Sequence, residues 1–580
     1  MSSPQGLSAR LAQMAADGIF VLLDLRFRRP DLTHLLGAFL LLVLGLSMIT
    51  TSALTDRYLH RGVESGSERP YVVQPSGREL STNVDMRVFT STDVRGVAAT
   101  LADAGFGYVR QKVSWAEVES VQGQYDWSSY DPIIDALSQE GIDVILVIVD
   151  APAWSVAGET VASDVRPPAD PAMLQDFAHE LTSHFGAKVP FLQVWDRPNL
   201  ASRWGGKPAT GVTFAPYLEA AFYGARSGNP EVQIITPELA RRPDVPEGLS
   251  DLAFLDSLYD AQATSFFDVV GISLSGGQYS PDDRRVNVDR VNFSRAILFR
   301  ELMLRHGDGA TPIWATTYGW AASDKITREE QAEYVVRGLE RAWSEWPWMG
   351  LMTQWQFATE PGDPQSVYAI APDGSSTPLY RRLTDLALRH RSDLANTGFA
   401  PMDADAISYQ GNWDDQHLEG RTFRTTNQVG SSATVTFRGT GLIAFLRSGP
   451  QSGEFELVLD GEVLPGGEGD NGDLWSFYAY RTDDLPRRLI DGLSDTEHTL
   501  RITLKSPGEL TLGGLVVERE PPFVWPVILL TVSSMILLFL GLRSLIYLVA
   551  IRSGHLRRRN DASDPILPAL PGWKPGRRLA

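Results

Sequence analysis

The sequence predicts an α/β fold: a (β/α)8 barrel of the TIM type followed by an antiparallel β-sandwich, bracketed by two transmembrane helices. Short apolar runs alternate with amphipathic helical stretches over residues 80–392, which is the pattern of parallel strands covered by helices. Short alternating strands separated by Gly, Asp and Asn turns follow over residues 403–518. Two long uncharged apolar runs, one near each end of the sequence, complete this plan.

The first apolar run covers residues 32–55 and is long enough to cross a bilayer as a helix. Arginines at the end of segment 1–31 predict that this segment lies in the cytoplasm. A cleaved signal peptide is the alternative, because Thr51-Ser52-Ala53 resembles a weak cleavage site. The apolar run exceeds the roughly 7–15 residues of a signal core, which favours an uncleaved anchor.

The second apolar run, residues 523–550, precedes a basic, Pro-rich tail at residues 551–580. The excess of Lys and Arg predicts that this tail is also cytoplasmic. Residues 56–79 are then a linker, and the barrel and the sandwich lie outside the cell membrane. The sequence therefore predicts a two-pass protein of the cytoplasmic (inner) membrane, with the lipid bilayer as one partner.

Eight apolar runs are the expected barrel strands. They are residues 83–89, 107–113, 143–150, 190–195, 232–236, 267–274, 311–317 and 350–357. Helical stretches between most of them imply parallel pairing, and eight such units fit a closed barrel. An open doubly wound sheet is the alternative, but no GxGxxG-type phosphate turn follows the first run.

Composition argues against several classes of function. The formal charge of −19 argues against a nucleic acid partner, because phosphates need a basic surface. The chain has no cysteine, which removes disulfides, thiolate metal sites and cysteine nucleophiles. The nine histidines form no HExxH motif or close pair, so we expect no metal and no cofactor.

Two segments after the second and third expected strands carry a family resemblance. Residues 114–131 read SWAEVESVQGQYDWSSYD, and residues 149–155 read VDAPAWS. The pattern W-x-x-V-E-x-x-x-G-x-Y-x-W-x-x-x-D, followed by a strand and a P-x-W turn, resembles clan A glycoside hydrolases, closest to families 39 and 5. The resemblance covers about residues 80–390. It implies hydrolysis of O-glycosyl bonds by two glutamates, one ending strand four and one ending strand seven.

Both glutamate positions of that family are substituted in this sequence. The W-N-E-P-N segment of the family reads Trp195-Asp196-Arg197-Pro198-Asn199, and its T-E-F-G-W segment reads Thr316-Thr317-Tyr318-Gly319-Trp320. Arg197 cannot exchange a proton near neutral pH, and Thr317 is a weak nucleophile without an adjacent base. Tyr318 is one residue out of phase and is expected on the opposite face of the strand. The His-Pro-Tyr type segment that the family has after strand six is replaced by Gly271–Gly276.

These substitutions predict a pseudoenzyme, for which no catalytic residue is expected. The resemblance still implies a sugar cleft, and we take aromatic and polar residues near the expected strand ends as substrate-binding candidates. The candidates are Trp115, Asp150, Trp154, Trp195, Asp196, Arg197, Asn199, Glu238, Trp320 and Trp355. Arg197 either binds an anionic glycan or pairs internally, with Asp196 or Glu238.

The module at residues 403–518 contains the segments Tyr409–Trp413 (YQGNW), GTGLIAFL and HTLRITL and the turn Leu459-Asp460-Gly461. With these segments it resembles the jelly-roll modules that accompany many glycoside hydrolases, which bind carbohydrate or brace the catalytic domain. Its aromatic cluster is a candidate binding platform, although half of the cluster must face inward if the stretch is a strand. The cluster consists of Trp475, Phe477, Tyr478 and Tyr480.

We therefore expect a protein that binds a polysaccharide or oligosaccharide without cutting it, within an envelope or exopolysaccharide assembly system whose membrane proteins are further partners. Two alternatives stay open. An active hydrolase would use two displaced carboxylates among Asp150, Asp196 and Glu238, since carboxyl groups about 6.5–9.5 Å apart support inversion. A scaffold that binds no sugar would fill the cleft with its own side chains.

Overall fold

The computed structural model describes residues 30–75, 79–90, 93–156, 165–241, 248–358, 367–370, 374–389, 393–418, 421–466, 472–521 and 523–552. The predicted cytoplasmic segments lie almost entirely outside these residues. The chain forms two compact units: the terminal segments up to Arg61 and from Pro522, and residues Gly62–Pro521.

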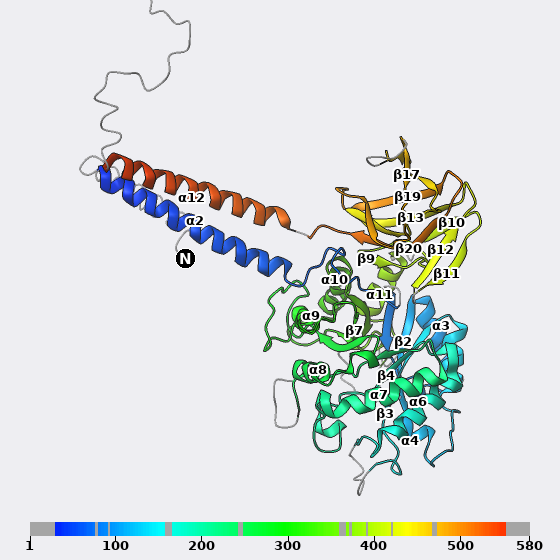
Figure 1. Ribbon diagram of the computed structural model, residues 1–580. Helices are drawn as coiled ribbons and strands as arrows, with labels where there is room; N and C mark the ends of the chain where they lie inside the picture. Colours follow the sequence, from blue (N-terminus) through cyan, green and yellow to red (C-terminus); the bar gives the residue numbers. More distant parts are fainter. Residues whose placement is uncertain are drawn as a thin grey trace, which may run out of the picture. The chain divides into compact units, whose positions relative to one another are not determined.

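Eight parallel strands form the barrel, and helices cover its outside (Figure 1). The strands are β1 (Leu80–Asn83), β2 (Phe106–Ser114), β3 (Asp143–Val149), β4 (Phe191–Val194), β5 (Gln233–Ile235), β6 (Val270–Ser275), β7 (Ile313–Gly319) and β8 (Met349–Gln354). They pair in the order β5-β4-β3-β2-β1-β8-β7-β6, and the parallel bridge between Ile235 and Val269 closes the cylinder. The predicted (β/α)8 barrel is confirmed.

The barrel helices are amphipathic and bury one face against the strands. They are α3 (Asp93–Asp103), α4 (Trp115–Val118), α5 (Asp131–Gln139), α6 (Pro171–Phe185), α7 (Gly211–Gly228), α8 (Asp251–Asp260), α9 (Ala296–Arg305), α10 (Arg328–Glu345) and α11 (Pro378–Arg389), with 3-10 turns η1 (Met86–Val88), η2 (Gly186–Lys188), η3 (Ala201–Arg203), η4 (Ala263–Phe266) and η5 (Phe293–Arg295). α10 illustrates how they begin: Thr327 and Glu330 form a reciprocal capping box that satisfies the first backbone N–H groups.

Continuous apolar runs form the buried strands, as β3 shows. Its residues from Val144 to Ile148 are fully buried, and each such side chain contributes about 1.5–3 kcal/mol relative to an exposed one. Because the strands are held this firmly, the loops at their C-terminal ends have a rigid base.

The first strand was predicted wrongly. We expected it at residues 83–89, but β1 is Leu80–Asn83, and Met86–Val88 form a 3-10 turn. The β1 residues Ser81 and Thr82 are polar because they bond to β8: the Ser81 hydroxyl shares a hydrogen bond with a threonine hydroxyl at 3.0 Å, and Thr82 donates to Gln354 Oε1 at 2.8 Å. A strand with such buried polar positions gives no apolar signal.

Two six-stranded antiparallel sheets form the β-sandwich, in the orders β10-β13-β19-β15-β16 and β11-β12-β20-β14-β18. β17 pairs with β15, and β9 pairs with β20. The strands are β9 (Gly398–Ala400), β10 (Ile407–Gln410), β11 (Asp414–Leu418), β12 (Arg421–Thr426), β13 (Ser432–Gly439), β14 (Gly441–Leu446), β15 (Glu454–Leu459), β16 (Glu462–Val463), β17 (Leu474–Ser476), β18 (Pro486–Ile490), β19 (Thr496–Leu504) and β20 (Leu510–Glu518). Since β9 belongs to this sheet, the sandwich strands begin before the predicted residue 403.

The segment expected as a linker, residues 56–79, is partly docked on the barrel. Glu64 Oε1 accepts a hydrogen bond of 2.8 Å from Arg300 Nε, and both side chains are largely buried. Trp348 Nε1 donates to the carbonyl oxygen of Gly62 at 3.2 Å. Residues 62–64 are therefore part of the barrel domain rather than a free tether.

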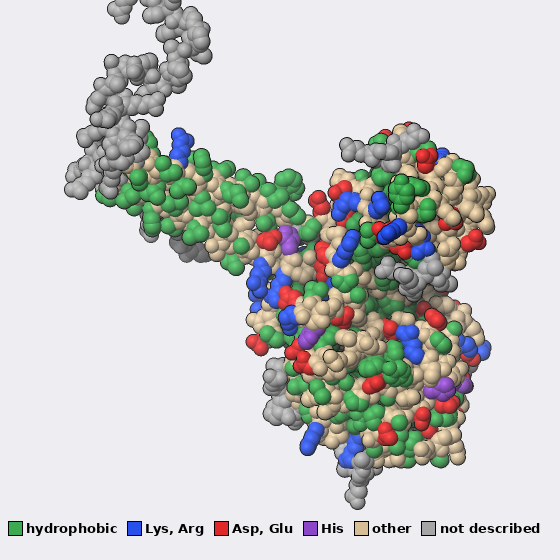
Figure 2. Space-filling view, viewed as in Figure 1, with side chains coloured by type: hydrophobic (Ala, Val, Ile, Leu, Met, Phe, Trp, Pro, Cys, Tyr) green, Lys and Arg blue, Asp and Glu red, His purple; other side chains and the backbone are tan. Residues whose placement is uncertain are grey.

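The terminal helices α2 (Pro30–His60) and α12 (Val524–Arg552) are long and apolar enough, by length and composition, to cross a membrane. They lie side by side (Figure 1), and hydrophobic side chains cover their surface in the view of Figure 2. The hydroxyls of Ser52 and Thr531 share a hydrogen bond of 2.8 Å. A Cβ added at Gly45 would lie 2.8 Å from the Leu538 side chain, so small residues allow this close antiparallel packing.

Candidate functional site

The C-terminal ends of β3 and β4 have an unusual backbone. Asp150, Trp195 and Arg197 adopt left-handed conformations, with φ values of 58°, 70° and 54°. Such conformations cost non-glycine residues about 1–3 kcal/mol each and cluster at functional sites. The barrel mouth therefore has strained backbone conformations at Asp150, Trp195 and Arg197, and these conformations set the directions of the three side chains.

Arg197 and Thr317, the two residues that we expected at the glutamate positions, both contact the carboxylate of Glu238. Arg197 Nη2 lies 2.9 Å from Glu238 Oε1, and Thr317 Oγ1 donates to Oε2 at 2.7 Å. The backbone supports this pairing, since the N–H of Arg197 donates to the carbonyl oxygen of Glu238 at 2.8 Å. Glu238 follows β5, so three strand ends converge on one anion.

A second arginine, Arg110 of β2, lies on the buried side of Glu238. Its Nη2 is 3.5 Å from Glu238 Oε2, while its Nε donates to Gln193 Oε1 at 2.7 Å and its Nη1 to Asn83 Oδ1 at 2.8 Å. Sequence analysis missed Arg110, because it lies within an apolar run that we interpreted only as a strand. A cation inside a buried strand was the available signal, since such a group needs a partner.

Glu238 is held ionised although it is almost fully buried. Burial alone would raise the pKa of its carboxyl group, but the charges of Arg197 and Arg110 outweigh burial and lower it. The hydrogen bond from Thr317 lowers this pKa further, whereas the nearby Asp196 opposes it. Glu238 is therefore an anion with internal partners on both oxygens.

Asp196 is the second buried carboxylate of the mouth. Its Oδ2 lies 3.1 Å from Lys112 Nζ, and Lys112 is 46% exposed at the end of β2. Burial raises the pKa of Asp196, but Lys112, Arg197 and Arg110 together hold it well below its usual range. Asp196 Oδ1 is buried without a hydrogen-bond partner among the described residues, and Arg197 Nε lies 3.9 Å from it.

Asp150 has the opposite titration behaviour. Burial raises the pKa of its carboxyl group, and the neighbouring charge of Asp196 raises it further, against the influence of Arg203 and Lys112. The mouth thus holds one carboxyl group with a raised pKa beside one with a lowered pKa.

Three of the predicted tryptophans are core residues. Trp115, Trp195 and Trp320 are each at most 1% exposed. Their indole N–H groups donate within the chain, to Glu119 Oε2 at 2.7 Å, to the carbonyl oxygen of Arg203 at 3.1 Å and to that of Tyr279 at 2.7 Å, respectively. The expectation that these rings contact a ligand is corrected: they brace the mouth loops from below.

Asn199 also has a structural position. Its amide nitrogen donates to the carbonyl oxygens of Ala240 and Leu249, and its Oδ1 accepts from the N–H of Ala240 at 2.9 Å. The side chain is fully buried. Asn199 joins the loop after β4 to the loop after β5, and its amide is not presented to a ligand.

Trp154 and Trp355 are the two candidate tryptophans that stay half-exposed. Trp154 donates from Nε1 to the carbonyl oxygen of Glu119 at 2.9 Å and lies edge-on to Trp115. Trp355 directly follows β8, and its Cβ lies 3.7 Å from the position that a Cβ on Gly319 would occupy. Trp154 and Trp355 are therefore the two predicted tryptophans that keep part of their surface exposed.

Tyr318 and the acidic and histidine side chains were considered as further functional groups. Tyr318 is fully buried and donates its hydroxyl to the carbonyl oxygen of Val335 in α10 at 2.6 Å, so it faces the helix layer. Within the described residues, no group of three or more His, Asp or Glu side chains is arranged to hold a metal ion.

The aromatic cluster of the sandwich divides into two halves. Phe477 is 8% exposed and packs on Phe455, and Trp475 is half-buried. Tyr478 and Tyr480 are 58% and 91% exposed, with ring centroids 5.9 Å apart. The two tyrosines are therefore the most exposed members of the cluster.

One family model matches part of the chain. A family model described as beta-galactosidase, Glyco_hydro_42, matches residues 90–159. No curated protein matches the chain. The family match covers the second and third strands and the motifs between them, but it is too short to assign a family to the whole chain.

Solved structures that resemble this chain include a glycoside hydrolase, a glucosidase and an endoxylanase. A family 39 glycoside hydrolase from Bacteroides cellulosilyticus is 18% identical and covers 75% of this chain and 83% of its own, with a TM-score of 0.45. A glucosidase from Croceicoccus marinus is 12% identical, covering 76% and 98%, with a TM-score of 0.43. A GH30 endoxylanase from Clostridium papyrosolvens is 12% identical, covering 75% and 98%, with a TM-score of 0.39. These identities are too low to indicate a substrate.

Proposed function

We propose that this protein is a membrane-anchored, extracytoplasmic polysaccharide-binding protein built on a degenerate glycoside hydrolase barrel. It serves envelope or exopolysaccharide assembly and binds its glycan without cleaving it. The observation that carries this proposal is the joint contact of Arg197 and Thr317 with Glu238. A retaining hydrolase needs two carboxyl groups about 5–5.5 Å apart, one of which gives up a proton while the other attacks. Here the two expected positions hold a guanidinium and a hydroxyl.

The charge of the mouth supports an anionic glycan. Arg197 and Lys112 are 38% and 46% exposed, and both lie beside buried carboxylates that fix their positions. Arg203 is half-buried in the loop after β4, and Lys207 in the same loop is exposed. Guanidinium and ammonium groups bind carboxylates and phosphates, so a glycan that carries uronic acid or phosphate groups fits this surface.

The helices α2 and α12 support anchoring in a membrane. Both present large apolar side chains to the outside, for example Phe39 at 61% and Leu529 at 64% exposed. A stripe of such residues along a helix of this length is unfavourable in water and favourable in hydrocarbon. We propose that both helices span the cytoplasmic membrane, with both termini in the cytoplasm and membrane proteins of a glycan assembly system as further partners.

The proposal is tested on the purified full-length protein in detergent. Aryl-glycosides and polysaccharides should give no turnover, while arrayed glycans should bind, with uronic acid-containing ones bound more tightly than their neutral counterparts. Asp196→Asn should leave the absence of turnover unchanged. Turnover that is abolished by the Asp196→Asn substitution would contradict the proposal that the protein binds its glycan without cleaving it. Absence of both turnover and binding favours a scaffold that carries no sugar.

One observation favours a hydrolase as the second candidate. Asp150 has a raised and Asp196 a lowered pKa, and carboxyl groups with separated pKa values are the pattern of a general acid beside a base. In this case Asp150 would protonate the leaving oxygen and Asp196 would activate water. Asp150→Asn would then reduce turnover as strongly as Asp196→Asn, with a bell-shaped pH profile in the native protein.

A further inference from the structure

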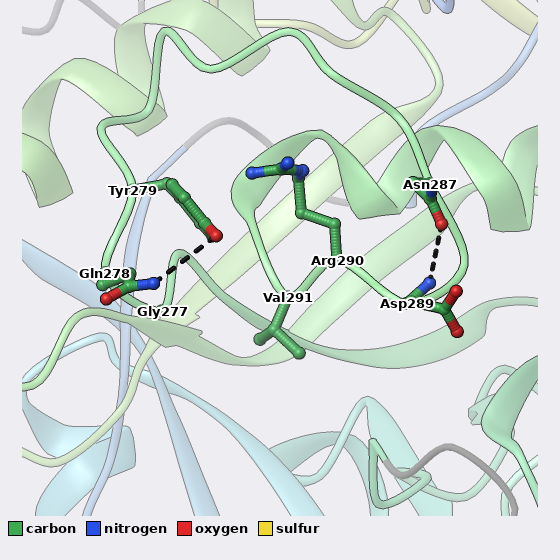
Figure 3. Close-up of a pocket in the computed structure, with 7 residues that line it drawn as sticks. All are labelled: Gly277, Gln278, Tyr279, Asn287, Asp289, Arg290 and Val291. Atoms are coloured by element: carbon green, nitrogen blue, oxygen red, sulfur yellow. Dashed lines mark hydrogen bonds between the residues drawn. The ribbon is translucent and has the colours of Figure 1, made fainter.

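A hollow of about 470 Å³ opens within the loop that joins β6 to α9. Its lining residues come from two stretches of that loop, residues 277–279 and residues 287–291 (Figure 3). This volume lies in the range of roughly 300–1,000 Å³ that is typical of ligand sites. None of these residues was a candidate in the sequence analysis.

The hollow lies beside the barrel mouth, because its loop starts where β6 ends next to β7. The N–H of Gly276 donates to the carbonyl oxygen of Gly319, the last residue of β7, at 3.2 Å. Trp320 then donates from its indole to the carbonyl oxygen of Tyr279 at 2.7 Å. Thr317 stands on the same strand, two residues before Gly319, so the loop and the contact with Glu238 share one end of the barrel.

Buried polar side chains hold the loop in place. Asn292 and Ser294 are fully buried; Asn292 Nδ2 donates to the carbonyl oxygens of Asp283 and Arg285, and Ser294 Oγ donates to that of Asp283 at 2.6 Å. Arg341 of α10 donates to the carbonyl oxygen of Pro281 at 2.5 Å. A long loop fixed in this way is pre-organised, which lowers the entropy cost of binding a ligand.

The walls of the hollow carry mixed donors and acceptors. Gln278, Asn287 and Asp289 are exposed and supply two amides and a carboxylate. The guanidinium of Arg290 lies 4.6 Å from the ring centre of Tyr279, so it covers the face of that ring and leaves the hydroxyl at the edge. Figure 3 shows Arg290 and Tyr279 facing each other inside the loop.

This chemistry distinguishes between classes of ligand. The lining is a poor match for an apolar ligand, because Val291 is its main apolar side chain. An anionic ligand would be repelled by the exposed carboxylate of Asp289, and the charge of Arg290 is already paired with Asp283 at 3.5 Å. Hydroxyl groups, which both donate and accept, suit a wall of amides, a carboxylate and a phenol hydroxyl.

We propose that the hollow is a second carbohydrate subsite, which holds an uncharged sugar residue of the same glycan chain that the barrel mouth binds. This inference rests on the proposed glycan binding. A chain that occupies the mouth near Thr317 and continues past the end of β7 reaches the hollow next. Simultaneous contact at two linked sites raises the affinity for long chains over short ones.

The test uses the full-length protein in detergent and arrayed oligosaccharides from disaccharides to octasaccharides, in neutral and uronic series. Val291→Trp fills the hollow, and Asp289→Ala removes a wall group. Val212→Trp is the matched control, because Val212 is also an exposed valine and lies on α7, outside the hollow. Thermal midpoints equal to that of the native protein show that the variants are folded. In the native protein and in Val212→Trp, affinity should rise with chain length.

Both hollow variants should keep the native affinity for short oligosaccharides. Their affinity should not rise with chain length, so for the longest oligosaccharides it should be roughly tenfold or more below that of the native protein. If Val291→Trp and Asp289→Ala retain the full gain with length, the subsite is refuted while glycan binding stands. If the native protein binds no oligosaccharide of any length, the proposed function fails and the subsite fails with it.

Discussion

Arg197 and Thr317 hydrogen-bond to opposite oxygens of one carboxylate, that of Glu238, at 2.9 and 2.7 Å. From the sequence resemblance we expect these two residues at the positions of the acid and the nucleophile of a glycosidase. Glu238, which both contact, follows a third strand and has partners within the chain on both oxygens. The charges at the mouth are therefore balanced by contacts within the chain. These contacts should contribute to the free energy of unfolding.

The first prediction concerns this ion pair. Arg197→Met removes a partner from a carboxylate that is 1% exposed, and breaking a buried pair costs about 3–5 kcal/mol. Because the Arg197 side chain is 38% exposed and Glu238 keeps Arg110, we expect a smaller loss, about 1–3 kcal/mol. The thermal midpoint in detergent should fall accordingly.

A double-mutant cycle separates this pair from general damage. Glu238→Gln should also destabilise, and the double variant should lose less than the sum of the two single losses. Arg337→Met is the control, because Arg337 forms surface pairs with Asp282 and Glu333 and such pairs contribute little. Additive losses in the cycle would show that Arg197 does not act through Glu238.

The second prediction separates ligand contact from core packing among the tryptophans. Trp355→Ala should weaken glycan binding, since one stacked ring contributes about 0.5–1.5 kcal/mol, and should change the thermal midpoint little. Trp115 is buried and stacks on Phe177 at 5.0 Å, so Trp115→Ala should lose about 3–5 kcal/mol of stability. Binding is measured on the array and stability by thermal unfolding. Unchanged glycan binding by Trp355→Ala would remove this ring from the site.

The sequence predicted the barrel because strands buried on both faces read as continuous apolar runs, as β3 shows. It also offered Glu238 as one of two partners for Arg197, and the structure selects Glu238 at 2.9 Å over Asp196 at 3.9 Å. The direction of a side chain is a different matter. Trp195 and Trp320 stand at the predicted strand ends, yet their rings turn into the core.

The sequence prediction mainly missed polar and charged residues on the barrel strands. Arg110 and Lys112 were hidden in the run GYVRQKV, although each contacts a carboxylate that the sequence did single out. The first strand was misplaced for the same reason, because Ser81 and Thr82 hydrogen-bond to Thr353 and Gln354 of β8 instead of making apolar contacts. Pairing partners far apart in the sequence cannot be read from local pattern.

The third prediction is a pH dependence in the sandwich. His498 Nδ1 lies 2.7 Å from Asp460 Oδ2, and its Nε2 lies 2.9 Å from the carbonyl oxygen of Ser494. Burial lowers the pKa of His498, but these two partners outweigh burial and raise it above the usual value. The charged ring therefore stabilises the fold below about pH 6.5, and this contribution is lost as pH rises through the folded pKa.

Thermal unfolding of His498→Gln across this range checks the sign. The variant should be less stable than the native protein near pH 5.5, and the difference should shrink by about pH 8. Asp460→Asn should show the same trend, because it removes the counter-charge. A difference that grows with pH would mean that the neutral ring is the stabilising form.

The last prediction tests the helix pair and the fate of the first apolar run together. Because the natural chain has no cysteine, Ser52→Cys with Thr531→Cys creates the only thiol pair in the protein. The two hydroxyls are 2.8 Å apart, and a disulfide needs Cβ atoms about 3.5–4.5 Å apart, so mild oxidation in membranes should cross-link the variant. Leu54→Cys with Thr531→Cys is the control, since Leu54 is 64% exposed on α2 and should not cross-link. Protection of both thiols from a maleimide-polyethylene glycol label, reversed by reductant, reports the bond.

If the first run were a signal peptide cleaved after Ala53, Ser52 would leave with it: the mature protein would run as a shorter chain and carry a single label with or without reductant. A full-length chain that takes two labels after oxidation would instead keep the first helix but refute its packing against α12.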